Sequence, residues 1–258
     1  MAYKDILVYL DATAGAAQRL RLAVALARTH GARLTGVDAS SEHALVGAWG
    51  DRALRIRPDF QAAVREAGLD SQFIGADAEP RLGAQLAHCV DLIIATRPDG
   101  EARRLVRDEV PDKVLIEAGA PVLVLPQEWP YGPVGDNVVI ACNASREAAR
   151  AVHDAMPLLE RAKKVTIFSF SARTRGFKVA AQQLAEHLQR HGVAAHLSDW
   201  TDTGDVSALE ALFASLDTQD ADLIVAGAFG HSRLFESLFG GVSVDLLRQP
   251  TAPILMSH

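Results

Sequence analysis

Short apolar runs alternate with amphipathic segments along the whole chain. The first run spans 6–10 and ends at Asp11, and a segment with helical spacing follows it as far as Gly31. A run without polar interruption is typical of a strand buried on both faces of a parallel sheet, and the helical segment supplies the crossover to the next strand. Further strands are predicted at 33–37, 72–75, 91–95 and 121–125, and further helices at 59–67, 81–89 and 110–118. This alternation predicts an α/β fold.

The same alternation begins again after 127–136, QEWPYGPVGD, which is rich in turn-forming residues and is the best candidate for a linker. Strands are predicted there at 138–143, 165–170, 194–197, 222–226 and 254–256, and helices at 145–159, 177–190 and 206–216. Ser145 precedes a helix-favouring run and is therefore predicted to be its N-cap.

Three pairs of segments match at nearly one spacing. Residues 138–143 repeat 6–11 at an offset of 132, 222–226 repeat 91–95 at 131, and 252–255 repeat 120–123 at 132. Matches in the same order at one offset indicate an internal duplication. We therefore predict two tandem five-stranded parallel-sheet domains, 1–126 and 137–258, joined by the linker 127–136.

Composition narrows the classes of partner. A formal net charge of −6 and a pI near 5.8 argue against a basic nucleic-acid footprint and against attachment to anionic lipid. The sequence passes directly into a strand pattern, and no apolar run approaches the roughly 18 residues of a membrane span. We expect a soluble, cytoplasmic protein in which Cys89 and Cys142 are reduced, buried apolar side chains.

Glycines gather after the predicted strand 222–226. Gly227 and Gly230 follow it directly, and Gly240 and Gly241 come after nine further residues, just before Val242 and Ser243. Glycines at the carboxyl end of a strand, together with free N–H groups at a helix start, let a phosphate approach the backbone closely. The alternative is that each glycine serves a turn or the packing of a helix on the sheet.

This spacing, with its flanking segments DLIVAG and APIL, resembles the glycine motif of the universal stress protein family, and the resemblance covers nearly the whole chain as a tandem of two such domains. It implies an adenine nucleotide alpha-hydrolase-like fold with flavodoxin- or Rossmann-type layering, in which the two domains form a pseudo-dimer within one chain. The resemblance does not imply whether the chain forms further oligomers. The family usually has Ser or Thr at the position of Gly241.

The resemblance also implies one adenine-nucleotide site, for ATP or a relative with no metal beyond nucleotide-bound Mg²⁺. Gly227, Gly230, Gly240 and Ser243 would surround the phosphates, and Asn143 would lie toward the base. Arg233, inside the loop, could pair with a phosphate through its planar fork, although a solvated arginine is the alternative.

The first half departs from this pattern. Asp11 stands where the family has an aspartate near the adenine, but the segment 95–100 lacks the glycine pair, so this half is not expected to hold a triphosphate and Asp11 is interpreted as structural. His187 and His191 have the i, i+4 spacing that metal sites use. A cation near a helix C-terminus explains them better, and no metal site is predicted.

Catalytic motifs are missing from the sequence: there is no G-x-S-x-G elbow, no Walker loop and no paired-carboxylate arrangement. The leading hypothesis is a stress-response binding module, with no catalytic residue assigned, whose second half holds the nucleotide. Two alternatives remain: a ligand-free scaffold that binds unknown partner proteins, and a slow ATPase.

Overall fold

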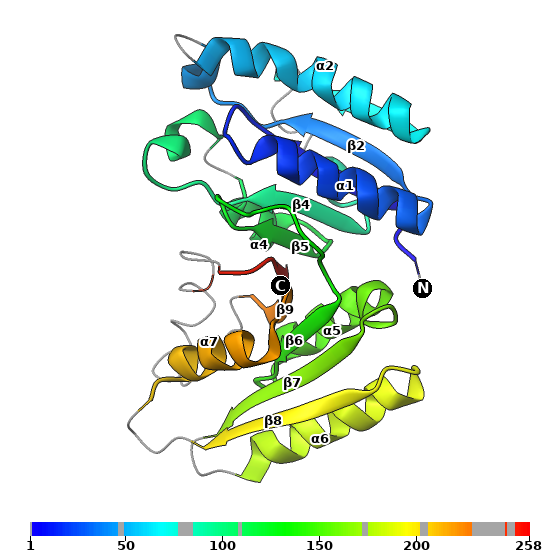
Figure 1. Ribbon diagram of the computed structural model, residues 1–258, viewed down its shortest axis with the longest axis vertical. Coiled ribbons are helices and arrows are strands. Elements are labelled where there is room, and N and C mark those ends of the chain that lie inside the picture. Colours follow the sequence, from blue (N-terminus) through cyan, green and yellow to red (C-terminus); the bar gives the residue numbers. More distant parts are fainter. Residues whose placement is uncertain are drawn as a thin grey trace. The chain divides into compact units, whose positions relative to one another are not determined.

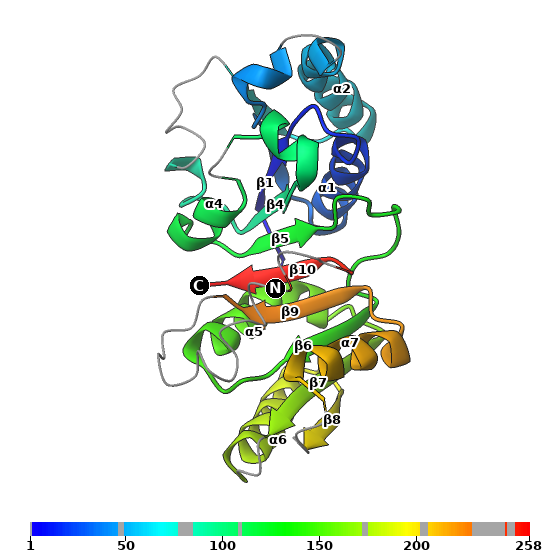
Figure 2. The ribbon, with the colours of Figure 1, turned by 90° about the vertical axis from the view of Figure 1, so that its left-hand side faces the viewer.

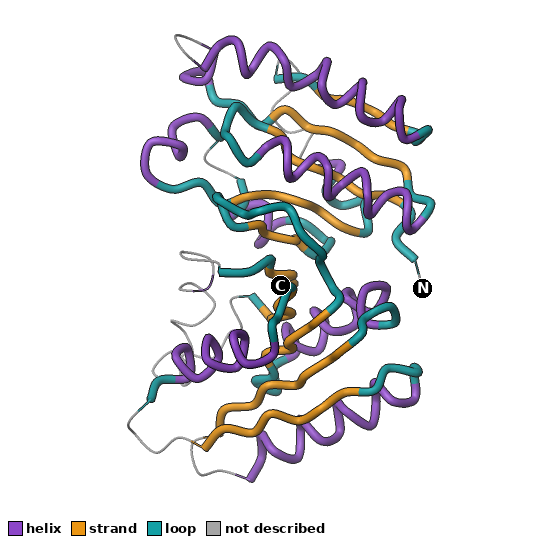
Figure 3. The backbone as a smooth tube through the Cα atoms, in the orientation of Figure 1, coloured by secondary structure: helices purple, strands orange, loops and turns teal. Residues whose placement is uncertain are grey.

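The computed structural model describes residues 2–45, 49–76, 85–107, 110–171, 175–201, 206–228, 246 and 251–258. The chain divides into two compact units, Met1–Tyr131 and Gly132–His258. Strands and helices alternate through both of them (Figure 3).

The first unit is a parallel sheet with the strand order β3-β2-β1-β4-β5. Its strands are β1 (Asp5–Leu10), β2 (Arg33–Asp38), β3 (Ser71–Ile74), β4 (Leu92–Thr96) and β5 (Val122–Leu125). Its helices are α1 (Ala16–His30), α2 (Gly50–Ala67) and α4 (Asp112–Glu117), with 3₁₀ turns η1 (Glu42–Leu45) and η3 (Gly100–Leu105). Helices α1 and α2 lie side by side on this sheet (Figure 1).

The second unit repeats this topology with the order β10-β9-β6-β7-β8, again parallel throughout. Its strands are β6 (Asn137–Ala141), β7 (Lys164–Ser171), β8 (Ala195–Thr201), β9 (Leu223–Gly227) and β10 (Ile254–Ser257). Its helices are α5 (Arg146–Leu159), α6 (Arg175–Arg190) and α7 (Ala208–Gln219). Figure 2 shows β9 lying between β6 and β10. The predicted fold class, two five-stranded parallel α/β domains in tandem, is confirmed.

The central strands are buried on both faces, as their uninterrupted apolar sequences predict. Ile6, Leu7 and Val8 of β1 are fully buried, and so are Leu223, Ile224 and Val225 of β9. Asp91 and Asp222, the repeated aspartates before β4 and β9, make matching hydrogen bonds to the backbone. Asp91 accepts hydrogen bonds from the backbone N–H groups of Lys4 (2.5 Å) and Asp5 (3.0 Å), and Asp222 accepts from Gly135 (2.8 Å), Asp136 (3.2 Å) and Asn137 (3.1 Å).

These bonds satisfy the free donors at the start of β1 and of β6, which explains why both halves keep the aspartate. Burial raises the pKa of Asp222, although the three backbone donors partly offset that cost.

Helix ends follow their sequence signals in most places. Gly31 and Gly68 end α1 and α2 in the left-handed conformation, with φ of 61° and 64°. Ser145 caps α5 by accepting a hydrogen bond from the Ala148 N–H at 3.1 Å, which confirms its predicted role.

The prediction for α2 was wrong at its start, because the helix begins at Gly50 and continues through Pro58 instead of starting at 59. Proline removes the bond to the carbonyl four residues earlier, but Leu54 is 76% exposed, on the side of the helix where water can satisfy that carbonyl. A buried stripe of Ala53, Ile56, Phe60 and Val64 spans the proline and holds the helix on the sheet.

Over the described ranges, no helix combines the length and the apolar character that crossing a membrane requires.

Candidate functional site

The second unit has a topological switch point between β6 and β9. From β6 the chain moves outward to β7 and β8, and it then returns to the other side of β6 as β9. In open parallel sheets, ligands bind at the carboxyl ends of the two strands where the direction reverses. Ala141 and Ala226 are paired there, at the ends of β6 and β9.

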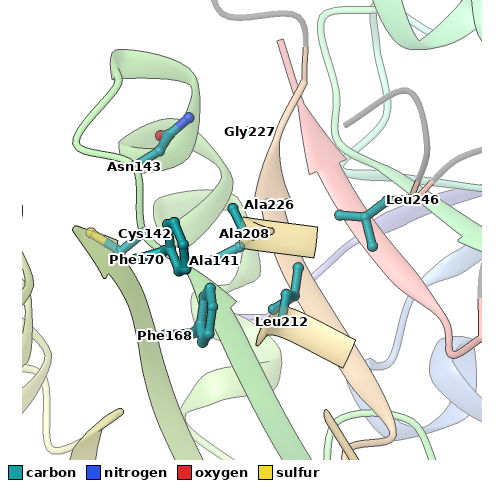
Figure 4. Close-up of a pocket in the computed structure, with 10 residues that line it drawn as sticks. All are labelled: Ala141, Cys142, Asn143, Phe168, Phe170, Ala208, Leu212, Ala226, Gly227 and Leu246. Carbon is teal, nitrogen blue, oxygen red and sulfur yellow. The ribbon is translucent and has the colours of Figure 1, made fainter. Parts of the chain in front are cut away.

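A pocket lies at this place. It is partly open to solvent, and its cavity volume is about 40 Å³. Its described lining is Ala141, Cys142, Asn143, Phe168, Phe170, Ala208, Leu212, Ala226, Gly227 and Leu246 (Figure 4). Since α7 supplies Ala208 and Leu212, the pocket lies on the face of the sheet that α7 covers. A mostly apolar lining with few polar groups is the usual composition of a small-molecule site.

Asn143 contributes a carboxamide side chain to this pocket, and a local hydrogen bond holds it in place. Its Oδ1 accepts from the N–H of Ser145 at 3.1 Å, an Asx turn that leads directly into the N-cap of α5. Ala144, between them, adopts the left-handed conformation with φ of 56°. The turn therefore fixes the side chain at the end of β6, where it is half-buried.

Cys142 also lines the pocket, but its thiol is a weak polar group. Burial raises the pKa of this thiol, and the Ala144 N–H, which favours the thiolate, offsets the effect only in part. The thiol therefore stays neutral at physiological pH. Both cysteines are free, and Cys89 is exposed rather than buried as expected, because it lies in an irregular segment between elements of the first unit.

Gly227 has a packing role that is independent of any ligand. A Cβ added to this glycine would lie 2.5 Å from the backbone N of Ala148 and 2.7 Å from the carbonyl carbon of Glu147. The first turn of α5 therefore occupies the space that a side chain at the end of β9 would need. This packing accounts for the glycine, and a phosphate contact at Gly227 stays a hypothesis.

Gly230, Arg233, Gly240 and Ser243, and also Gly241, lie outside the described residues. Of the six predicted site residues, the structure brings Asn143 and Gly227 together at the pocket. Sequence reasoning missed Phe168 and Phe170. A signal for them was present, because residues two apart on a strand share a face and these two lie near the carboxyl end of β7, the strand beside β6.

The corresponding place in the first unit is arranged differently. The Asp11 carboxylate accepts hydrogen bonds from the N–H (2.9 Å) and the hydroxyl of Thr13, and it forms an ion pair with the Arg19 guanidinium at 2.5 Å. Arg19 also donates to the carbonyl of Tyr9 at 2.6 Å and is fully buried, and Asp11 is 4% exposed. Both oxygens of Asp11 are therefore used within the protein, which supports its structural interpretation.

Other charged groups of the first unit have local partners. Arg97 and Arg103, which follow β4, form ion pairs with Asp112, at 3.3 and 3.8 Å. Burial raises the pKa of Asp38, at the end of β2, although the backbone N–H of Ser40 donates a hydrogen bond to it at 2.9 Å and Arg107 lies nearby. The two ion pairs of Asp112 are partly exposed to solvent and are local structural contacts.

Three histidines meet where α5 and α6 pack. The ring of His187 lies 4.7 Å from that of His191 and 5.3 Å from that of His153, measured between centroids. Within the part of the chain that the structure describes, no group of three His, Cys, Asp or Glu side chains is placed to hold a metal ion.

No protein-family model matches the chain, and no curated protein matches it. Among solved structures, it is similar to a universal stress protein from Archaeoglobus fulgidus DSM 4304, with a TM-score of 0.75 and 15% identity over 98% of this chain and 97% of that chain. A functionally unknown protein from Pseudomonas aeruginosa PAO1 matches with a TM-score of 0.64 and 17% identity, over 99% of this chain and 92% of that chain. At these identities the likeness concerns the fold, which is that of a universal stress protein along the full length of the chain.

Proposed function

We propose that the chain, which has the universal stress protein fold in two copies, is a tandem member of that family and acts as a cytoplasmic stress-response protein that binds a purine nucleotide in its second unit. The observation that carries this proposal is the pocket at the β6–β9 switch point. Asn143 would face the base, and the segment that contains Gly230, Arg233, Gly240 and Ser243 would surround the phosphates.

The chemistry of the pocket lining supports a mostly apolar ligand group with few polar atoms. Phe168 and Phe170 supply aromatic surface, Leu212 and Ala208 close the side formed by α7, and Asn143 provides the amide. Stacking and apolar contact suit a nucleobase, and a few placed polar groups fix its orientation.

Binding is proposed rather than hydrolysis. The pocket's described lining includes no carboxylate or imidazole that could position a water molecule against a phosphate. ATP is accordingly treated as a bound ligand and not as a substrate. The domain limits 1–126 and 137–258, the linker 127–136 and the pseudo-dimer are part of the same proposal.

A pocket-filling variant tests this function. Ala208 begins α7 and lines the pocket, so Ala208→Phe places a ring where the ligand would lie. We expect wild-type protein to bind AMP, ADP, ATP or IMP in calorimetry, and Ala208→Phe to bind at least tenfold more weakly.

Ala214→Phe is the matched control, because Ala214 lies on the same helix but is exposed to solvent. It should bind as wild type does. Absence of binding by all four nucleotides in wild type, or equal affinity in Ala208→Phe, would refute the proposed function.

A further inference from the structure

The amide of Asn143 has a fixed orientation. A backbone N–H can only donate, so the atom that faces Ser145 N at 3.1 Å must be the acceptor Oδ1, and the other end of the carboxamide is the donor Nδ2. Figure 4 shows this nitrogen on the side of the carboxamide that faces the end of β9. Among the described residues, Nδ2 has no hydrogen-bond partner.

The remaining described lining cannot replace this donor. Phe168, Phe170, Leu212 and Leu246 are apolar, and the Cys142 thiol is neutral and a weak donor. The backbone N–H of Cys142 already donates to the carbonyl of Phe168 at 2.9 Å. Among the described side chains of the lining, the strongest polar group that a ligand could meet is therefore the Nδ2 amide of Asn143, which can only donate.

We infer that the pocket selects a base that presents a carbonyl oxygen to Asn143, such as a 6-oxopurine, over a base that presents an exocyclic amine there. An amine would place a donor against the Nδ2 donor, and burying two unmatched donors costs each its hydrogen bond to water. A carbonyl oxygen instead accepts from Nδ2 while Oδ1 keeps its bond to Ser145. This inference rests on the proposed nucleotide site and names the class of base that the site takes.

The variant Asn143→Asp should reverse this preference between bases. A carboxylate still accepts from Ser145 N with one oxygen, so the Asx turn is preserved, but its other oxygen becomes an acceptor in place of the donor. The variant should therefore favour an exocyclic amine. IMP and AMP are suitable probes because they carry the same ribose phosphate and differ only at the edge of the base.

The experiment compares the ratio of the two dissociation constants in calorimetry, since an added charge on the protein affects both nucleotides alike. Wild type should bind IMP about tenfold more tightly than AMP, and Asn143→Asp should bind AMP more tightly than IMP, as expected for one net hydrogen bond. Asn137→Asp makes the same chemical change at the opposite end of β6, outside the pocket, and should keep the wild-type ratio.

The possible failures are distinct. If wild type binds AMP as tightly as IMP, or if the ratio is the same in Asn143→Asp, the inference is wrong and the nucleotide site stands. If wild type binds neither nucleotide nor any relative in the set above, the proposed function fails, and the inference fails with it.

Discussion

One buried arginine distinguishes the two units at the scale of single residues. Arg19 of α1 corresponds, at the repeat offset of 132, to Ala151 of α5, and its partner Asp11 corresponds to Asn143. Both residues of the ion pair are therefore replaced together by neutral ones. A change of this kind avoids leaving one buried charge without its partner.

Removing Arg19 should destabilise the protein strongly. Arg19→Met takes the cation from Asp11 and should cost about 3–5 kcal/mol in the free energy of unfolding, because the carboxylate stays buried without compensation. Adding Asp11→Asn removes that charge, so the double variant should be less destabilised than the two single changes predict when added, by about 1–3 kcal/mol. Urea unfolding of the four proteins measures this coupling.

Arg21→Met is the control for this cycle. Arg21 lies on the same helix, but it is exposed and its guanidinium stacks 4.1 Å above the ring of Tyr131. Its loss should cost about 1 kcal/mol or less. Additive effects of the Arg19 and Asp11 changes would contradict the buried pair.

At the scale of elements, hydrophobic periodicity predicted the strands and most helices, because tertiary burial acts on the same faces that the pattern marks. It failed at α2, where Pro58 suggested a break but the buried stripe through Phe60 continued across it. It also gave no reason to separate Arg19 from Arg21, two residues further along α1. Only the position of Arg19 on the buried face, in line with Ala23 and Ala27, marks it as internal.

The candidate site was predictable only in part, because the sequence marks strand ends but not the packing between elements. Asn143 was found because it ends a strand, and strand ends in parallel sheets face ligands. Phe168 and Phe170 were overlooked because aromatic residues in a strand usually indicate core. Gly227 was read as a phosphate contact, although its tight packing against α5 depends on a distance between elements that no local pattern contains.

The packing of α5 against α6 should depend on pH through His187. Burial lowers the pKa of this histidine, and the nearby His191, His153 and Arg190 lower it further. The unfolded chain therefore binds the proton more readily than the folded one. Stability should fall as the pH drops below about 6.5, the usual histidine pKa, and the loss should level off below the lowered folded pKa.

Urea unfolding between pH 8 and pH 5 tests this dependence. His187→Phe should lose much less stability than wild type as the pH falls through 6.5, because phenylalanine has no group that takes up a proton. Gln182→Phe introduces the same ring at an exposed position of α6 and should keep the wild-type slope. An unchanged slope in His187→Phe would show that another group carries the effect.

At the scale of the whole molecule, the two units share the topology of their sheets but differ at the carboxyl ends of the strands. The strand register shows which residues of the two units correspond. Tyr9 pairs with Val37 in the first unit, and at the same position of the second unit Ala141 pairs with Phe168. Two residues further on, Ala39 stands in the place of Phe170. The first unit therefore lacks both aromatic rings that line the pocket of the second.

The chain should accordingly bind one nucleotide and not two. In the first unit Asp11 is occupied by Arg19 and Thr13, and small aliphatic residues replace the rings, so neither the polar contact nor the stacking surface is available. Calorimetric titration with IMP should give a stoichiometry near one per chain, and Ala208→Phe, which changes the second unit alone, should weaken this single site at least tenfold. A stoichiometry of two, or a site that keeps wild-type affinity in Ala208→Phe, would place a ligand in the first unit and contradict the assignment, because nothing in that variant alters Asp11 or its neighbours.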